Sequence, residues 1–344
     1  MNANVSFVRL ISYLLALILL FFSIILMVFY PEKFNPDFDS YLQIYGLSIR
    51  DAPSQTSNTM RYIFSYFQFL PSYKIIRSLL AISQLVLYFY IFKKLRFKFS
   101  DIGLITFTPL ISIILLKGHV QIRESIALIL FFLSCLEIEK KNFFSIKNFF
   151  LASLSLILHQ SMLINYLSCI ILLNKKISNS IKIFFLFIIF SSLALSAYPA
   201  FVNIVNKVIY LYPTSYELIQ LNIYKSIYWL SWLILIIFAF IRQKNSINLF
   251  KNLNTSKTKV IELLGIIGTY GFLFYFPISL LGLSLGQTNG AVFNYIIRLT
   301  LNLNIFISLY QIKYHKKSIY TAGINFVTLF SIGRLLFLPS LLLR

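Results

Sequence analysis

The chain has 344 residues, of which 58% are hydrophobic and only 12% charged, and its mean hydropathy is +0.80. A soluble domain needs about a quarter of its residues charged, which excludes a soluble protein, and an aromatic content of 17% excludes a disordered chain. The net charge of +21, which in a soluble protein would suggest a nucleic-acid partner, is here expected to set orientation across a membrane.

Runs of about 17–25 apolar residues are typical of membrane-spanning helices. They predict an all-α, polytopic integral membrane protein with one membrane domain over residues 1–344 and about ten or eleven membrane segments. The first run is too long for a signal peptide and is expected to be a retained first helix. The predicted spans are 10–30, 74–92, 102–117, 120–137, 181–199, 224–241, 260–285, 293–312 and 319–340.

The stretch 148–173 is ambiguous, because it fits either one long tilted helix or a short hairpin broken near His159. Basic clusters mark the cytoplasmic side of a membrane protein, and two such clusters flank this stretch. An even number of crossings between them favours the hairpin, with His159 near its outer tip and the N-terminus of the chain in the cytoplasm. The clusters are Lys93/Lys94/Arg96/Lys98, Lys140/Lys141/Lys147, Lys175/Lys176/Lys182, Arg242 to Lys259 and Lys313/Lys316/Lys317.

Three segments outside the spans complete the predicted arrangement. The outer loop at about 31–73 ends in an amphipathic stretch, and the outer segment at about 200–223 carries a second one. Both suit helices that lie in the membrane interface. The Asn- and Lys-rich segment at about 242–259 is expected to be a cytoplasmic loop.

A polar stretch, Lys117 to Glu124, interrupts the apolar sequence on the predicted outer side. It can be an ordinary loop followed by a helix N-terminus, where Glu124 would be favourable. Arg123, however, stands at the start of the next predicted helix, at about the level in the bilayer where a membrane-bound anion would lie. A guanidinium beside a helix N-terminus is suited to bind a diphosphate.

His159 is the second candidate, in the sequence Leu158-His159-Gln160-Ser161. A lone histidine on an apolar face is usually a core residue with its hydrogen bonds satisfied, but the flanking polar residues enlarge this polar spot. Imidazole titrates in the range that a general base needs. His159 is therefore a candidate base.

The remaining candidates lie at the ends of predicted spans and in the first outer loop. Arg298 and, more weakly, Arg334 stand within apolar sequence, where ionisable residues are often functional, although arginines at helix ends also act as interfacial anchors. Asp37 and Asp39, followed by Tyr41, could activate a hydroxyl or hold a cation, but Asp is also a routine residue of turns.

No motif for a metal, a cofactor or a soluble nucleotide is present in the sequence, and none of these ligands is expected. The two cysteines, Cys135 and Cys169, lie in apolar runs and predict neither a disulfide nor a metal site. The energy for any reaction would have to come from an activated substrate, such as a lipid-linked diphosphate.

Four sequence elements together resemble the EpsG family of polysaccharide polymerases, relatives of the Wzy-type O-antigen polymerases. They are Asp37/Asp39 with Tyr41 and Tyr45, then Gly118 with Gln121-Ile122-Arg123, Ser125 and Ala127, then His159 with Ser161, and finally Arg298 at the start of a helix. Their order and spacing carry the resemblance over roughly residues 30–310.

This resemblance implies a GT-C-like glycosyltransferase of the bacterial inner membrane, acting at its outer face. A glycan would leave undecaprenyl diphosphate and join another lipid-linked repeat unit of an O-antigen, capsule or exopolysaccharide. The substrate would be an undecaprenyl-diphosphate-linked oligosaccharide, and a chain-length regulator and a flippase are the implied partners. His159, Asp39 and Arg123 would be catalytic, and Arg298, Gln121, Asp37, Tyr41 and Arg334 would bind substrate.

Other functions also fit parts of the pattern. A flippase for the same lipid-linked sugars would share basic outer groups, although transporters usually contain internal repeats. A membrane acyltransferase could use a histidine among helices, and a scaffold would need neither the arginines nor the histidine. Surface glycan from a deletion strain separates them: single units indicate a polymerase, no glycan a flippase, and unchanged length with altered mass an acyltransferase.

Overall fold

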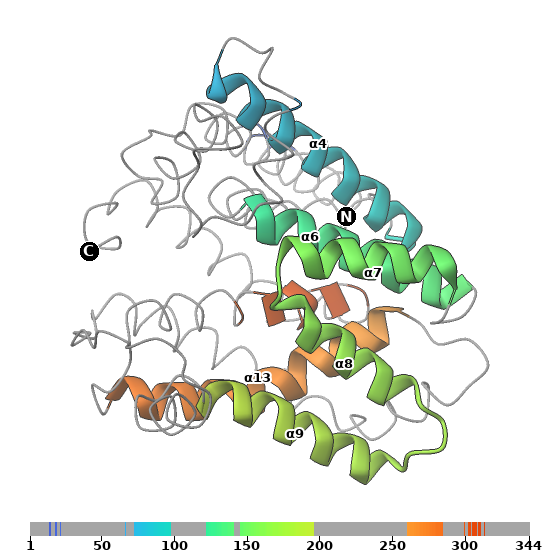
Figure 1. Ribbon diagram of the computed structural model, residues 1–344, viewed down its shortest axis with the longest axis vertical. Helices are drawn as coiled ribbons and strands as arrows, with labels where there is room; N and C mark the ends of the chain where they lie inside the picture. The colour runs from blue at the N-terminus through green and yellow to red at the C-terminus, as the bar shows by residue number, and fades with distance from the viewer. Residues whose placement is uncertain are drawn as a thin grey trace, which may run out of the picture. The chain divides into compact units, whose positions relative to one another are not determined.

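The computed structural model describes residues 72–97, 122–140, 145–195 and 260–284, four isolated residues before them (14, 18, 21 and 66) and part of the stretch 299–313. All regular structure in these residues is helical (Figure 1). The labelled helices are α4 (Tyr73–Lys94), α6 (Ile122–Lys140), α7 (Ile146–Leu158), α8 (Met162–Leu173), α9 (Asn179–Leu195) and α13 (Val260–Ser284).

The chain groups into two compact units. The first comprises Met1–Leu163 with Lys316–Arg344 and contains α4, α6 and α7; the second comprises Ile164–His315 and contains α9 and α13. Helix α8 begins in the first unit and continues in the second. The prediction of a single membrane domain over residues 1–344 depends on how these two units associate, and it stays a prediction.

The observed helices lie close to the predicted spans. The span expected at 74–92 corresponds to α4, the one at 120–137 to α6, and the one at 260–285 to α13. The stretch 148–173 is divided into α7 and α8, because the backbone of His159 is extended (φ −152°, ψ 112°). The predicted break is confirmed, and a continuous helix is excluded. The expected spans 10–30, 102–117, 224–241 and 319–340, and the segments 31–73, 200–223 and 242–259, lie at least in large part outside the described residues.

Within the described part of the chain, one helix is both long and apolar enough to cross a membrane, over Ile75–Lys94. Helix α6 is comparable in length, but it carries too many charged residues, among them Arg123, Glu124 and Glu137. Four shorter stretches are apolar helices: Ile146–Leu158, Met162–Leu173, Asn179–Leu195 and Val260–Tyr275.

The C-terminal end of α4 is fixed by backbone geometry. Arg96 adopts a left-handed conformation (φ 57°), which ends the helix. The Phe97 N–H then donates to the Phe92 carbonyl (3.1 Å) and the Arg96 N–H to the Lys93 carbonyl (3.1 Å). The rings of Phe92 and Phe97 pack edge to face, 5.9 Å apart. This Schellman motif stops α4 next to the basic residues predicted to lie in the cytoplasm.

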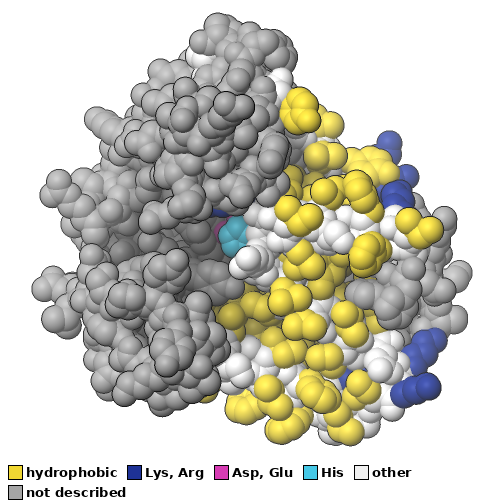
Figure 2. Space-filling model, in the orientation of Figure 1, with side chains coloured by type: hydrophobic (Ala, Val, Ile, Leu, Met, Phe, Trp, Pro, Cys, Tyr) yellow, Lys and Arg dark blue, Asp and Glu magenta, His cyan; other side chains and the backbone are white. Residues whose placement is uncertain are grey.

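Polar and apolar side chains are distributed as expected for helices in lipid. Large hydrophobic side chains are exposed on each unit, and they cover much of the described surface in Figure 2. Small polar side chains are buried instead, among them Ser125, Ser134, Asn148 and Ser155. Large exposed apolar patches are rare on soluble monomers, so this distribution supports a membrane environment.

In the second unit, α13 packs through glycines. A Cβ atom at Gly271 would lie 2.6 Å from the Phe190 ring of α9, and one at Gly265 2.7 Å from the Tyr310 ring. At Gly268 a Cβ atom would lie 2.8 Å from the Leu303 carbonyl oxygen. Glycine is therefore required at these three positions of the helix, because no larger residue allows so close an approach.

One basic residue that the sequence assigns to a cytoplasmic cluster is not on the surface. Lys182 lies in the first turns of α9, with only 1% of the residue exposed. Its position follows from the helix start, where the Ser178 hydroxyl accepts a hydrogen bond from the Ile181 N–H (3.4 Å). The lysines before this cap, Lys175 and Lys176, are exposed as expected.

Candidate functional site

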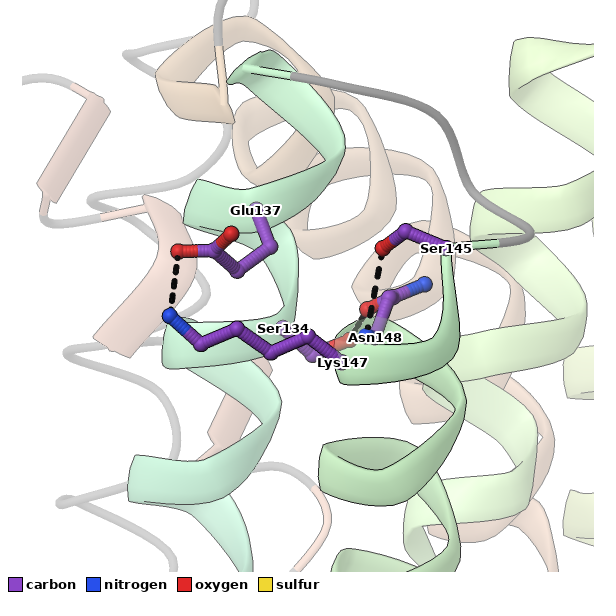
Figure 3. A network of polar contacts seen from close by, with 5 residues as sticks. All are labelled: Ser134, Glu137, Ser145, Lys147 and Asn148. Atoms are coloured by element: carbon purple, nitrogen blue, oxygen red, sulfur yellow. Dashed lines mark hydrogen bonds and ion pairs between the residues drawn. The ribbon is translucent and has the colours of Figure 1, made fainter.

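Three polar contacts join α6 to α7 along their length. Near the end of α6, Lys147 Nζ lies 3.0 Å from Glu137 Oε1 (Figure 3). One turn further along, the Ser134 hydroxyl donates to the Asn148 side-chain oxygen. At the other end, the Ser155 hydroxyl donates to the Ala127 carbonyl (2.8 Å). These contacts fix the register of the two helices.

The same contacts show the relative direction of α6 and α7. Residue numbers fall along α6 from Glu137 to Ala127 while they rise along α7 from Lys147 to Ser155, so the helices are antiparallel neighbours (Figure 1). Arg123 and His159 each lie four residues beyond the Ala127–Ser155 bond, which is about one helical turn. The register therefore places the two predicted residues at about the same level along the helix pair.

His159 is held at the end of α7 from two sides. Its backbone N–H donates to the Ser155 carbonyl (3.0 Å) and continues the helical hydrogen bonding, while its ring Nδ1 lies 2.6 Å from the Ser161 hydroxyl. Ser161 is buried and His159 is partly exposed. The hydrogen bond fixes the orientation of the imidazole, with Nε2 on the opposite side of the ring.

Arg123 lies in the first turn of α6, and the residues that follow it are buried. Glu124 is 2% exposed, in the first turn, where a negative charge is favourable next to the positive end of the helix dipole. The Ser125 hydroxyl donates to Gln84 Oε1 of α4 (2.5 Å). This bond ties the start of α6 to the middle of α4.

Tyr88 extends this connection along α4. Its ring packs edge to face on Phe132 of α6, with centroids 6.4 Å apart. The contacts Gln84–Ser125 and Tyr88–Phe132 advance together along both helices, so α4 and α6 run in the same direction. Helices α4 and α6 are thus parallel, and α6 and α7 are antiparallel. The predicted membrane topology requires the same relative directions.

Of the site residues predicted from the sequence, the described part of the chain contains Arg123 and His159, and it brings them to one level. The others lie outside the described residues: Asp37, Asp39, Tyr41, Gln121, Arg298 and Arg334. Their roles stay predictions.

Sequence reasoning did not select two buried polar residues of α4. Gln84 bonds to Ser125, and Arg77 lies two turns before it with 3% of the residue exposed. A signal was present, because ionisable and amide side chains within an apolar span are unusual and often functional. Arg77 places a buried guanidinium on α4, the helix that packs against α6.

Among the described residues, no three His, Cys, Asp or Glu side chains gather as a metal site. Cys135 on α6 and Cys169 on α8 are buried thiols. The described site thus offers a guanidinium, an imidazole, a hydroxyl and a buried carboxylate, which are groups that bind anions and transfer protons.

Nearly the whole chain matches one known protein family. The EpsG family matches residues 15–341, which is nearly the whole chain. The chain belongs to the EpsG family. No curated protein and no solved structure matches it.

Membership of the EpsG family makes the chain a membrane protein of exopolysaccharide biosynthesis. The resemblance carried by the short motifs around Arg123, His159 and Arg298 is therefore confirmed. The exposed apolar surfaces of the described helices agree with the membrane location of the family.

Proposed function

We infer that this EpsG-family protein is a polysaccharide polymerase. It transfers a glycan from undecaprenyl diphosphate onto a lipid-linked repeat unit at the outer face of the bacterial inner membrane. The observation that carries this proposal is the α6–α7 register, which sets Arg123 and His159 at one level at the same end of the helix pair.

The two side chains suit the two demands of the reaction. A hydroxyl of the acceptor sugar attacks the anomeric carbon of the donor, the bond from that carbon to the diphosphate oxygen breaks, and undecaprenyl diphosphate leaves. Arg123 stabilises the negative charge that grows on the diphosphate, which its planar guanidinium can bind with two hydrogen bonds. His159 Nε2 takes the proton of the attacking hydroxyl.

The residues outside the described part of the chain complete the proposed site. Asp39 is the alternative base, Arg298 and Arg334 are further diphosphate ligands, and Gln121, Asp37 and Tyr41 contact the sugars. These assignments rest on the family motifs and on the chemistry of each side chain. Because the leaving group is already an anion at neutral pH, the reaction needs cationic stabilisation and no acid.

The membrane arrangement of the proposal has the N-terminus in the cytoplasm and about ten or eleven membrane segments in a GT-C-like fold. The directions of α4, α6 and α7 agree with it. In that arrangement α4 and α6 both run from the outer to the inner side, and Lys147 and Lys176 lie at the inner side. The chain-length regulator and the flippase are the partners of the same pathway.

The variant Arg123→Ala tests the proposal. Loss of one charge-stabilising donor from such a site lowers turnover by about 100- to 1,000-fold, so the strain should display single repeat units at its surface in place of polymer. Arg123→Lys, which keeps the charge but not the fork, should restore only part of the polymer. A gel of surface glycan and a blot for the tagged protein make the measurement.

Arg96→Asn is the matched control, because it removes a guanidinium at the inner end of α4 and asparagine tolerates the left-handed conformation of that position. Polymer of normal length is expected from it. Normal polymer from Arg123→Ala at normal protein level would overturn the role of Arg123. Absence of all surface glycan would indicate a flippase instead, and unchanged length with altered mass an acyltransferase.

A further inference from the structure

The break between α7 and α8 carries an inference about depth in the membrane. The residues between the two helices are His159, Gln160 and Ser161, and their backbone does not continue either helix. Gln160 is exposed and His159 is partly exposed. Two turn-type bonds, from the Met162 N–H to the His159 carbonyl and from the Leu163 N–H to the Gln160 carbonyl, restart the chain as α8.

Helix α7 is too short to carry this break across a bilayer. Lys147, whose side chain is 67% exposed, marks the end of α7 that is predicted to be cytoplasmic. From Lys147 to His159 an α-helix rises about 18 Å, whereas the hydrocarbon core of a bilayer is about 30 Å thick. Tilting the helix only reduces the depth that it covers.

Helix α8 gives the same answer independently. From Met162 to Leu173 it rises about 17 Å, and the exposed residues Asn174, Lys175 and Lys176 follow it. If both ends of the hairpin lie in the cytoplasm, the break stays about 12 Å below the outer boundary of the hydrocarbon core. If the chain instead crosses the membrane once, the break falls near the midplane. In either arrangement the break lies within the hydrocarbon depth.

Non-helical backbone and exposed polar side chains are tolerated at this depth only where protein covers them or water reaches them. Gln160 is exposed, which favours water. We propose that the His159–Ser161 turn forms the floor of a water-filled recess that opens to the outer face of the membrane. The α6–α7 register sets Arg123 at the level of this floor.

The chemistry of the recess indicates its ligand. A guanidinium, an imidazole and an amide at hydrocarbon depth suit a hydrated anionic headgroup, such as the diphosphate and first sugar of a lipid-linked glycan. This inference uses the membrane arrangement of the proposed polymerase but none of its reaction steps. A polymerase whose base is another residue would still have the recess.

Thiol labelling tests the recess without requiring turnover. In a background where Cys135 and Cys169 are replaced by alanine, Gln160→Cys should react with a membrane-impermeant charged thiol reagent added outside intact spheroplasts. Lys176→Cys should react only in inverted vesicles. Phe149→Cys, an exposed position on α7, should react in neither because it faces lipid.

The sign of the charge in the recess can be measured with the same variant. Gln160→Cys should react several-fold faster with an anionic reagent than with a cationic one, and Arg123→Gln should remove most of this preference. An environment-sensitive fluorophore on Gln160→Cys should be quenched best by lipids labelled in the middle of the acyl chain. Quenching only by headgroup-labelled lipids, or no labelling from outside, would overturn the proposal.

These outcomes separate the recess from the proposed function. Outside labelling of Gln160→Cys in a protein that makes no polymer would leave the recess standing and count against the polymerase. Gln160→Cys that is closed to the outer reagent in a strain with normal polymer would overturn the recess alone. The blot for the tagged protein checks that each variant is present in the membrane.

Discussion

The two units of the molecule hold their helices together in different ways. Between α6 and α7 the contacts are polar: an ion pair, a bond between two side chains and a bond to a backbone carbonyl. Between α13 and its neighbours they are steric, with Gly265, Gly268 and Gly271 each placed against a ring or a backbone atom. Lipid offers no hydrophobic drive to bring helices together, so both devices are needed in a membrane protein.

The difference concerns what each interface specifies. A glycine face allows close approach and a large contact area. Its contacts are alike at successive positions, however, so they do not select a single register. A hydrogen bond joins two particular atoms and so selects a single register. The polar interface lies in the unit that contains Arg123 and His159, where a shift of register would place the two residues at different levels. We therefore expect glycine contacts to determine stability and polar contacts to determine alignment.

The largest effect on stability is expected from Gly268→Val. The new Cβ would lie 2.8 Å from the Leu303 carbonyl oxygen, which belongs to the backbone and cannot turn aside as a side chain can. Overpacking of this kind costs about 1–3 kcal/mol, and the midpoint of thermal unfolding in detergent should fall by several degrees.

Pro277→Ala is the control for this prediction. It changes the same helix at an exposed position, and removing a proline from a helix interior does not introduce a clash. Its midpoint should be unchanged or higher. Equal midpoints for Gly268→Val and Pro277→Ala would show that the glycine face does not determine stability.

A smaller effect is expected from the pair Ser134 and Asn148. Asn148→Leu leaves the buried Ser134 hydroxyl without its acceptor, and Ser134→Ala removes the donor. Interhelical hydrogen bonds within membranes contribute about 0.6 kcal/mol on average and rarely more than about 1.7 kcal/mol. A double-mutant cycle on unfolding free energy should therefore give a coupling in that range.

The same cycle tests alignment when it is combined with crosslinking. A disulfide between cysteines placed at Ala127 and Ser155 should form readily in the otherwise cysteine-free protein and less readily with Asn148→Leu added. Unchanged crosslinking in the Asn148→Leu background would break the link between the polar contacts and the register.

The smallest effect is expected from the ion pair. The side chain of Lys147 is 67% exposed and that of Glu137 is 11% exposed; solvent and salt reach the Lys147 ammonium and screen the pair, which limits its contribution to about 1 kcal/mol. Lys147→Met should therefore lower the unfolding free energy by less than about 1 kcal/mol, with the difference shrinking as salt rises. A loss of unfolding free energy as large as that of Gly268→Val would show instead that charge pairs determine the stability of the first unit.

Hydropathy was sufficient to locate α4, α6 and α13, because apolar runs of span length report burial in lipid directly. The break at His159 could also be predicted. A polar triplet interrupts the apolar stretch, and the basic clusters on both of its sides favour two crossings over a single helix. The glycine contacts of α13 could not be predicted. The sequence contains the glycines, but which residues face them depends on the packing of segments far apart in the chain.

The site shows the same limit. Arg123 and His159 stand out as ionisable residues in apolar sequence, and family motifs add to that signal. Their common level could not be read from the sequence, because it follows from the register of α6 against α7. Gln84 and Asn148 were overlooked for a related reason: an amide within a span signals a partner, but only the packed structure identifies Ser125 and Ser134 as those partners.

Helix α4 and helix α7, both in the first unit, have different lengths. Helix α4 is 22 residues long and its C-terminal end is fixed by the Phe92–Phe97 motif, whereas α7 has 13 residues. Helix α4 is about 33 Å long and α7 about 20 Å, so lipids beside the two helices meet apolar surfaces of different height. Such hydrophobic mismatch is relieved partly by local thinning of the bilayer. A thinner bilayer beside α7 would lower the outer headgroups toward His159 and shorten the descent of a lipid-linked substrate.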